Sequence, residues 1–474
     1  MEGLLFIYQN KQRDVKPLNT AKNDLTQGSL VKRVVFFSIP FLLANIIQAL
    51  YGAADLFFIG QYCPAESVAA VSTATQVTQI ITSIISGLTL GGTVLVGKYV
   101  GMKREKEVRE TIGTNLTLFF FVGIILTVLL LTFAEPILYA LQTPAAAFEK
   151  AKEYVWVCGF GIVFICGYNA ISAILRGYGD SKTPLIFVAF AGGLNIIGDY
   201  IFVKYFHMDV SGAALATIIS QGVSMFCSII YLNKKKFIFT FKLSNFKIVK
   251  SRAIELAKVG IPITLQECMV RFSFLYLTSV TNSLGVAASS AVGIASKYDV
   301  FAMLPATSAA SALASVVAQN YGAGKYDRMN KSLLVGVCFA LPISMCFFLW
   351  AQISPETMIG LFTKDAETIS VGVDFFRTCS YDYIAVLFVF CFNGYLNGRT
   401  KTLFTMVSCC FGALALRMPL IYLVCKYFPG TLGIIGTVAP TVSGIMAVYT
   451  FIYIMHLIRK QNREQTTVNT YEFE

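Results

Sequence analysis

Apolar runs of about twenty residues recur along the whole chain, and each is long enough to cross the ~30 Å hydrocarbon core of a bilayer. We count about twelve such runs, at residues 33–57, 67–96, 111–133, 155–175, 184–204, 211–232, 254–281, 287–318, 332–351, 375–396, 403–425 and 432–458. The alternation of apolar and polar residues that marks a transmembrane β-strand is absent from these runs. The sequence therefore predicts an all-α polytopic membrane protein with about 12 transmembrane helices.

The charged residues support this class and indicate an orientation. Only 14% of the residues are charged, whereas soluble proteins carry about 25%. The net charge of +12 comes from Lys and Arg clusters that fall in alternate loops and near both termini. By the positive-inside rule these loops and both termini are expected in the cytoplasm. We therefore attribute the basicity to orientation in the lipid bilayer and expect no nucleic-acid partner.

The chain contains an internal repeat. Gly101 opens a polar turn that matches the turn at Gly322, Ser38-Ile39-Pro40 matches Gly260-Ile261-Pro262, and Leu175-Arg176-Gly177 matches Leu396-Asn397-Gly398. Spacings of roughly 220 residues divide the chain into two similar halves of six expected helices each. Because six is even, both halves enter the membrane from the same side, which predicts a parallel repeat, a V-shaped central cavity and the architecture of a transporter.

The longest polar connection gives the expected domain boundaries. It runs over residues 233–252 and begins with three lysines. We expect a cytoplasmic tail at 1–28, a first six-helix lobe at 29–232, this basic cytoplasmic loop, a second lobe at 253–460 and a cytoplasmic tail at 461–474. The first tail lacks the pattern of a signal peptide. The twelve cysteines include no Cys-x-x-Cys motif, so we expect neither a disulfide framework nor a metal site built from them.

Ionisable groups within apolar runs are the strongest candidates for function. Each costs about 2.5–3.5 kcal/mol on insertion scales. Asp55 lies deep in the first run, after Pro40, which we expect to act as a hinge because proline removes a backbone donor. In the fifth run Asn195 and Asp199 share one helical face, and Thr217 adds a hydroxyl from the sixth. Carboxylate and amide oxygens bind hard cations or share a proton; the alternative for Asp199 is an interfacial position near the end of its run.

These acids are not duplicated in the second half. A shift of about 220 residues places Asp55 near Tyr276 and Leu277, and Asp199 near Met418. The repeat therefore predicts the architecture, and the first copy alone is expected to handle a coupling cation.

The second half carries other charged groups inside its apolar runs. Glu267 stands one turn before Arg271, so the two either neutralise each other or face a cavity. The roles of Lys297, Asp299, Asp382 and Arg417 stay open at this level. We expect a substrate cavity to draw on aromatic and acidic side chains, because aromatic faces bind organic cations; its candidate residues are Tyr51, Tyr168, Glu267, Tyr276, Tyr298 and Asp382.

Taken together, several motifs resemble those of the multidrug and toxic compound extrusion (MATE) family. They are Pro40 followed by Asp55, the turn at residues 101–106, the segment from Leu175 to Pro184, and Asn195-Ile196-Ile197-Gly198-Asp199. The resemblance covers about residues 25 to 460 and is strongest to the DNA-damage-inducible subgroup of bacteria and archaea. That subgroup has its cation site in the N-terminal lobe, and its aspartate, Asn-x-x-x-Asp motif and threonine match Asp55, Asn195, Asp199 and Thr217.

The resemblance implies a secondary active efflux transporter. Such a protein exports amphipathic, often cationic aromatic compounds in exchange for H⁺ or Na⁺ by alternating access, needs no cofactor and is not an enzyme. We expect a monomer in a prokaryotic cell membrane, with Na⁺ or H⁺ bound at Asp55, Asn195 and Asp199. Another branch of the family places a glutamate in the seventh helix and an aspartate in the tenth, but Glu267 and Asp382 match those positions poorly.

Two other functions remain as alternatives. The first is a flippase for lipid-linked saccharides or lipid precursors, which has a related fold and usually a more cationic cavity. The second is an intramembrane enzyme, which the sequence disfavours because the only histidines, His207 and His456, lie near the ends of runs and form no His-Glu-x-x-His motif.

Overall fold

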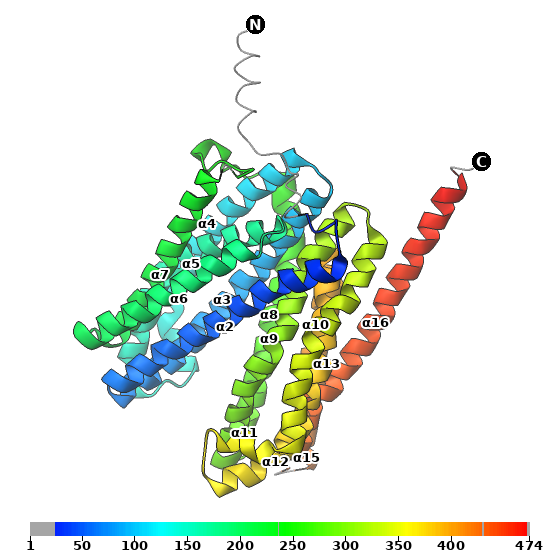
Figure 1. Ribbon diagram of the computed structural model, residues 1–474. Helices are drawn as coiled ribbons and strands as arrows, with labels where there is room; N and C mark the ends of the chain where they lie inside the picture. Colours follow the sequence, from blue (N-terminus) through cyan, green and yellow to red (C-terminus); the bar gives the residue numbers. More distant parts are fainter. Residues whose placement is uncertain (1–23, 236, 429–430, 472–474) are drawn as a thin grey trace. The chain divides into compact units, whose positions relative to one another are not determined.

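The computed structural model describes residues 24–235, 237–428 and 431–471, with residues 465–471 as backbone only. Most of the predicted N-terminal tail, and the end of the C-terminal one, lie outside these residues. All regular elements in the described part are helices (Figure 1). The first half contains α2 (Leu30–Tyr62), α3 (Ala65–Gly101), α4 (Glu105–Ala140), α5 (Ala145–Gly177), α6 (Lys182–Asp199), the π-helix η1 (Tyr200–Tyr205) and α7 (Asp209–Lys234).

The second half follows the short 3₁₀ helix η2 (Leu243–Asn245). It contains α8 (Lys250–Asn282), α9 (Val286–Gly322), α10 (Tyr326–Ile353), α11 (Pro355–Gly360), α12 (Ala366–Cys379), α13 (Tyr381–Gly398), α14 (Thr402–Cys410), the π-helix η3 (Phe411–Arg417), α15 (Met418–Tyr427) and α16 (Leu432–Tyr471). By length and composition, eleven spans in the described part are able to cross a membrane. The remaining long helix, α8, is less apolar because Glu255, Lys258, Glu267 and Arg271 interrupt it. The all-α membrane fold predicted from the sequence is confirmed.

The helices form two compact units. The first contains Leu43–Thr264 with residues 24–28 and Ala318–Gly324, and the second contains Ser29–Leu42, Leu265–Val317 and the chain from Lys325 onward. Helix α2 changes unit two residues after Pro40, and α8 changes unit two residues after Pro262. The two prolines of the repeat therefore mark the places where these helices pass from one unit to the other.

Close helix contacts account for the repeated glycines of the first unit. A Cβ atom on Gly101 would lie 2.0 Å from the carbonyl oxygen of Gln319, and one on Gly322 would lie 2.1 Å from that of Lys98. The ends of α3 and α9 thus meet backbone to backbone, each through its own glycine. Such contact lets helices approach closely in lipid, where packing drives association.

A second pair of repeated glycines serves the same purpose once in each unit. A Cβ on Gly177 would lie 2.6 Å from the carbonyl oxygen of Thr93 in the first unit, and one on Gly398 would lie 2.8 Å from that of Ala314 in the second. Both partners are displaced by 221 residues along the chain, from Gly177 to Gly398 and from Thr93 to Ala314. The repeat therefore extends to individual contacts between helices.

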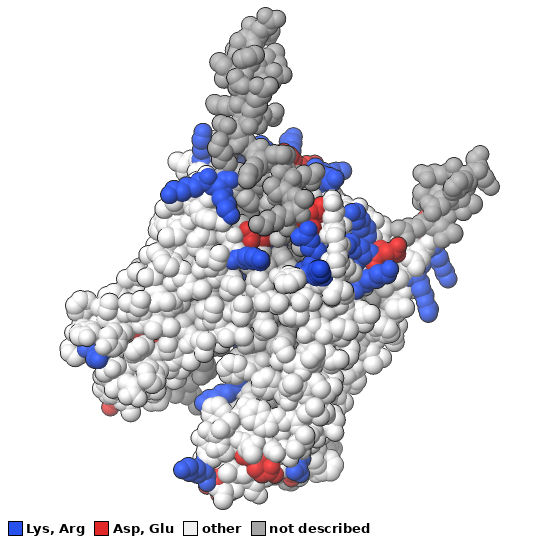
Figure 2. Space-filling model, viewed as in Figure 1, with Lys and Arg blue, Asp and Glu red and all other residues white. Residues whose placement is uncertain are grey.

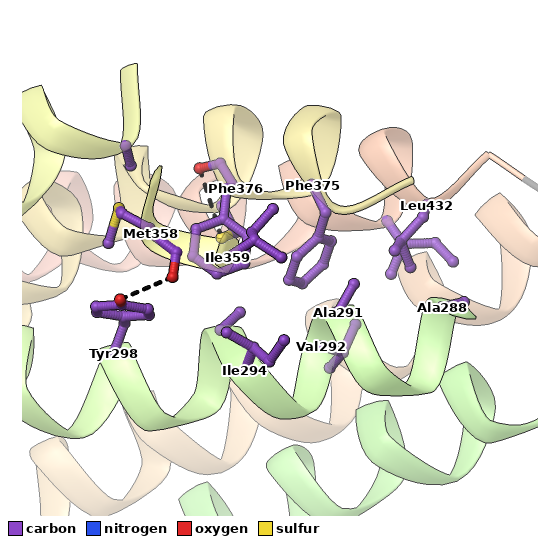
Figure 3. Close-up of a cluster of buried hydrophobic side chains, with 14 residues drawn as sticks. Ala288, Ala291, Val292, Ile294, Tyr298, Met358, Ile359, Phe375, Phe376 and Leu432 are labelled. Carbon is purple, nitrogen blue, oxygen red and sulfur yellow. Dashed lines mark hydrogen bonds between the residues drawn. The ribbon is translucent and has the colours of Figure 1, made fainter. Parts of the chain in front are cut away.

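An apolar cluster forms one part of the core of the second unit (Figure 3). Side chains from α9, α11, α12 and α16 meet there, with Phe375 and Phe376 facing Ala291 and Ile359. The hydroxyl of Tyr298 donates a hydrogen bond of 2.8 Å to the carbonyl oxygen of Met358, so its one polar atom is satisfied inside this cluster.

Charged side chains gather at the ends of the helices, while the flanks of the helices are almost free of them (Figure 2). At one such end of the first unit, Arg252 binds Glu110 through Nε at 3.3 Å and Glu255 through Nη1 at 2.9 Å. Tyr99 forms hydrogen bonds with Arg252 and Glu255 as well. This network fixes the start of α8 to α3 and α4.

Candidate cation site

The polar residues predicted from the sequence meet inside the first unit. Asp55 comes from α2, Asn195 and Asp199 from α6, and Thr217 from α7. Asp55 is 7% exposed, Asn195 1% and Asp199 0%. Buried carboxylates are rare in proteins unless they have partners, so their grouping on three helices points to a site.

Thr217 connects the helices through its hydroxyl. Its Oγ1 donates to Asp55 Oδ2 at 3.4 Å and accepts a hydrogen bond of 3.2 Å from Asn195 Nδ2. The carboxyl groups of Asp55 and Asp199 are close enough to interact electrostatically with each other. The chain of contacts thus runs from α6 through α7 to α2 and ends at a pair of acids.

Four oxygen atoms of this group lack a well-formed hydrogen bond to any described residue. They are Asp55 Oδ1, Asn195 Oδ1 and both carboxylate oxygens of Asp199. An unsatisfied buried polar atom is costly, and four in one place have no structural explanation. Oxygens from carboxylates and an amide form the donor set that hard cations such as Na⁺ prefer, and two neighbouring carboxylates are also suited to share a proton.

The local backbone is shaped around these acids. Helix α6 ends at Asp199 and continues directly as the π-helix η1; π-turns are rare and are frequent at functional sites. Gly198 allows α6 to approach α7, because a Cβ at this position would lie 2.9 Å from the Cβ of Ala216. Ala216 and Gly198 are the chain neighbours of Thr217 and Asp199, so this contact sets the separation of the site's own residues.

We predict that Gly198→Ala weakens the site selectively. The added methyl group must push α6 away from α7 and move Asp199 relative to Thr217, which should lower the apparent affinity for the coupling cation severalfold. The measurement is the cation concentration that gives half-maximal efflux. Gly193→Ala on the same helix is the matched control, because a Cβ there meets nothing within 4 Å. Equal cation dependence in both variants would contradict this role of Gly198.

Two residues near the acids were not predicted from the sequence. Tyr154 and Cys158 on α5 are 4% and 7% exposed, and both interact electrostatically with Asp55. They are spaced by four residues and therefore share a helical face. That spacing was available in the sequence, but a tyrosine and a cysteine in an apolar run are usual core residues.

The predicted aromatic cavity residues have different surroundings. Tyr51 is partly buried one turn before Asp55 and packs against Gly192, whose added Cβ would lie 3.4 Å from the Tyr51 ring. Tyr168 is 4% exposed, lies in an apolar cluster and donates a hydrogen bond of 2.9 Å to the carbonyl oxygen of Pro184. Tyr298 is likewise engaged in the apolar cluster of the second unit (Figure 3). The contacts of Tyr168 and Tyr298 are those of core side chains.

The remaining predicted cavity residues lie in the second unit. Glu267 and Tyr276 are partly buried on α8, and Asp382 is 5% exposed on α13. Glu267 interacts electrostatically with Arg271, but no direct ion pair joins them in the described part of the chain. These residues are not part of the group around Asp55.

The hinge candidate and the metal candidates complete the predicted set. Pro40 is a buried residue inside α2, which continues as a helix on both sides of it. Among the described residues there is no group of three or more His, Cys, Asp or Glu side chains that could hold a metal ion. The oxygens around Asp55 and Asp199 are thus suited to a monovalent cation.

Comparison with known proteins identifies the family. Residues 40–201 and 262–423 each match the MatE family model, so the match occurs twice. The probable multidrug resistance protein YpnP of Bacillus subtilis is 28% identical over 396 residues, with 84% of this chain and 88% of that protein covered. The probable multidrug resistance protein NorM of Thermotoga maritima is 26% identical, with 85% and 87% covered.

Solved structures agree on the fold. A crystal structure of MATE in the bent conformation has a TM-score of 0.87 at 22% identity and covers 93% of this chain and 98% of its own. An outward-facing MATE transporter of the MOP superfamily has a TM-score of 0.86 at 22% identity, with 94% and 98% covered. With its twofold match and its two sets of membrane-spanning helices, the chain belongs to the MatE family, whose members are membrane transporters rather than enzymes.

Proposed function

We propose that this protein exports amphipathic organic compounds, often cationic and aromatic, in exchange for H⁺ or Na⁺. The observation that carries the proposal is the buried pair of Asp55 and Asp199 with four oxygens that lack hydrogen bonds. Relatives named as multidrug resistance or multidrug export proteins support the class of substrate. The basic loops support a cell membrane location with both termini in the cytoplasm.

The coupling cation binds between α2 and α6 in this scheme. Asp55 and Asp199 supply charge, while Asn195 and Thr217 supply neutral oxygens and hold the carboxylates in position. A bound proton or Na⁺ removes the repulsion between the two acids, which favours a conformation in which α2 and α6 are closer. Release of the cation restores the repulsion. The cation therefore changes the relative stability of two conformations, as a coupling ion must.

Dye transport in proteoliposomes tests the proposal. Ethidium transport is measured with an imposed pH gradient, with an imposed Na⁺ gradient, and with neither. We expect transport against the dye gradient with at least one ion gradient and none after both collapse. Dye transport that is unaffected by either gradient would contradict antiport. If only lipid-linked saccharide moved across the bilayer, the flippase alternative would be supported instead.

Pro40 is the proposed hinge of this movement. We predict that Pro40→Ala slows gradient-driven efflux several-fold, because restoring the backbone hydrogen bond stiffens α2 where it passes between the two units. Cation binding should persist, since Pro40 contributes no atom to the site. Initial efflux rate and cation-dependent thermal stabilisation are measured on the same preparation. If both were unchanged, Pro40 would have no hinge function.

A further inference from the structure

A small cavity inside the second unit has charged walls that the proposed function does not use. Its volume is about 30 Å³, which is enough for one or two water molecules. Most of its lining is apolar, including Phe274, Phe375 and Ile435. Three charged side chains also line it, from α9, α13 and η3: Asp299, Asp382 and Arg417.

This cavity is the repeat counterpart of the cation site in the first unit. The two MatE matches begin at residues 40 and 262, which gives a shift of 222 residues. The same shift carries Asp55, Asn195, Asp199 and Thr217 onto four residues of the second half. These are Leu277, Arg417, Ile421 and Ala439, and all four line the cavity.

The chemistry of the two sites has been exchanged. The first site has two acids, an amide and a hydroxyl, whereas its counterpart has two aliphatic residues, an alanine and an arginine. The acids of the second cavity come from other helices, and the same shift takes Asp299 and Asp382 back to Val77 and Phe160. The second cavity therefore acquired its own carboxylates together with a built-in positive charge at the position of Asn195.

The contacts of these three residues place the arginine as their common counter-ion. Asp382 is 5% exposed, and its Oδ1 lacks a hydrogen bond in the described part of the chain. Arg417 Nε is also buried without such a bond. The guanidinium interacts electrostatically with both Asp299 and Asp382, and it lies 5.4 Å from the centre of the Phe274 ring. No direct ion pair joins the arginine to either acid among the described residues, so the cavity lies between the charges.

We propose that Arg417 is the resident cation of the second unit. Its guanidinium takes the part that an exchangeable cation takes in the first unit, and it compensates Asp299 and Asp382. An arginine cannot lose its proton in a protein and is covalently attached. The second unit is therefore closed to the coupling ion, and exchange is confined to the first unit. With Arg417 neutralised, the cavity becomes a site for a small monovalent cation.

The test is sodium binding after removal of the arginine charge. It is made in full-length protein that also carries Asp55→Asn and Asp199→Asn, so that the first site does not contribute. Binding of radioactive sodium and Na⁺-dependent thermal stabilisation are measured at alkaline pH, where protons compete least. We expect the Asp55→Asn, Asp199→Asn parent to bind no sodium, Arg417→Gln to gain sodium binding, and added Asp382→Asn to abolish the gain.

The controls separate charge from general disturbance. Arg417→Lys keeps the charge and should gain nothing. Arg377→Gln removes a charge from the same unit but from a pair with Glu356 in which both side chains are about half exposed, and it should also gain nothing. Should Arg417→Gln fail to fold, Arg417→Gln with Asp299→Asn restores the net charge of the cavity and retains Asp382 as a ligand.

Two results would overturn the proposal. One is a folded Arg417→Gln variant, or the charge-restored variant, that binds no more sodium than its parent. The other is sodium binding by the parent that Asp382→Asn removes, because the cavity would then accept a cation with Arg417 in place. Neither result depends on the first unit, so both are distinct from a failure of the proposed coupling site.

Discussion

Asp55→Asn is expected to abolish accumulation of substrate against its gradient while leaving the protein folded. The substitution keeps the shape of the side chain and its contact with Thr217, but it removes one of the two charges that would hold the cation. A tenfold ion gradient is worth about 1.4 kcal/mol and supports about a tenfold substrate gradient when one ion exchanges for one substrate. In the variant this ratio should fall to about one.

The measurement is ethidium accumulation in proteoliposomes under an imposed pH or Na⁺ gradient. Glu149→Gln is the matched control, because Glu149 is an exposed acid on α5 of the same unit and lies outside the site. It should accumulate dye as the wild type does. Full accumulation by Asp55→Asn would remove Asp55 from the coupling mechanism.

Gly101→Ala should produce the largest loss of stability among the glycine substitutions of the first unit. The new Cβ would lie 2.0 Å from a backbone oxygen of α9, and a backbone atom cannot move aside as a flexible side chain can. Overpacking of this kind costs about 1–3 kcal/mol. Gly322→Ala should have a similar effect, since its Cβ would meet the backbone oxygen of Lys98 at 2.1 Å.

The contact between α3 and α9 also involves side chains that these substitutions would displace. Gln319 accepts a hydrogen bond from the backbone of Leu25 at 3.1 Å and donates one to the carbonyl oxygen of Gly177 at 2.8 Å. Both bonds should weaken when the helices separate. Thermal unfolding of purified protein is the readout, and Gly52→Ala is the control because a Cβ there meets nothing within 4 Å. Equal melting temperatures for Gly101→Ala and Gly52→Ala would contradict the contact.

The fold was predictable from the sequence because long apolar runs in water-free surroundings have few structural options. The repeat was also visible, yet its physical purpose was not. Gly101 and Gly322 were recognisable as equivalent positions, but only the structure shows that they face each other's helices across one contact. Sequence equivalence alone does not distinguish two separate turns from one joint.

The candidate site was partly predictable for a similar reason. Asp55 and Asp199 stand out because charged residues in apolar runs are costly, whereas Tyr154 and Cys158 resemble ordinary core residues. The counterpart cavity was missed because a shift of about 220 residues places Asp199 near Met418, whereas the family match gives 222 and leads to Ile421. An error of two residues in register moves a side chain to another face of its helix.

Substrate-induced release of the coupling cation tests the central claim most directly. Ethidium is added to purified protein in detergent, and released protons or sodium ions are measured for the wild type, Asp55→Asn, Asp199→Asn and Glu149→Gln. Because the two carboxylates act as one site, the wild type and Glu149→Gln should release about one cation per bound substrate. Both aspartate variants should release none. Release that persists in Asp55→Asn and Asp199→Asn would show that the coupling ion binds elsewhere in the protein.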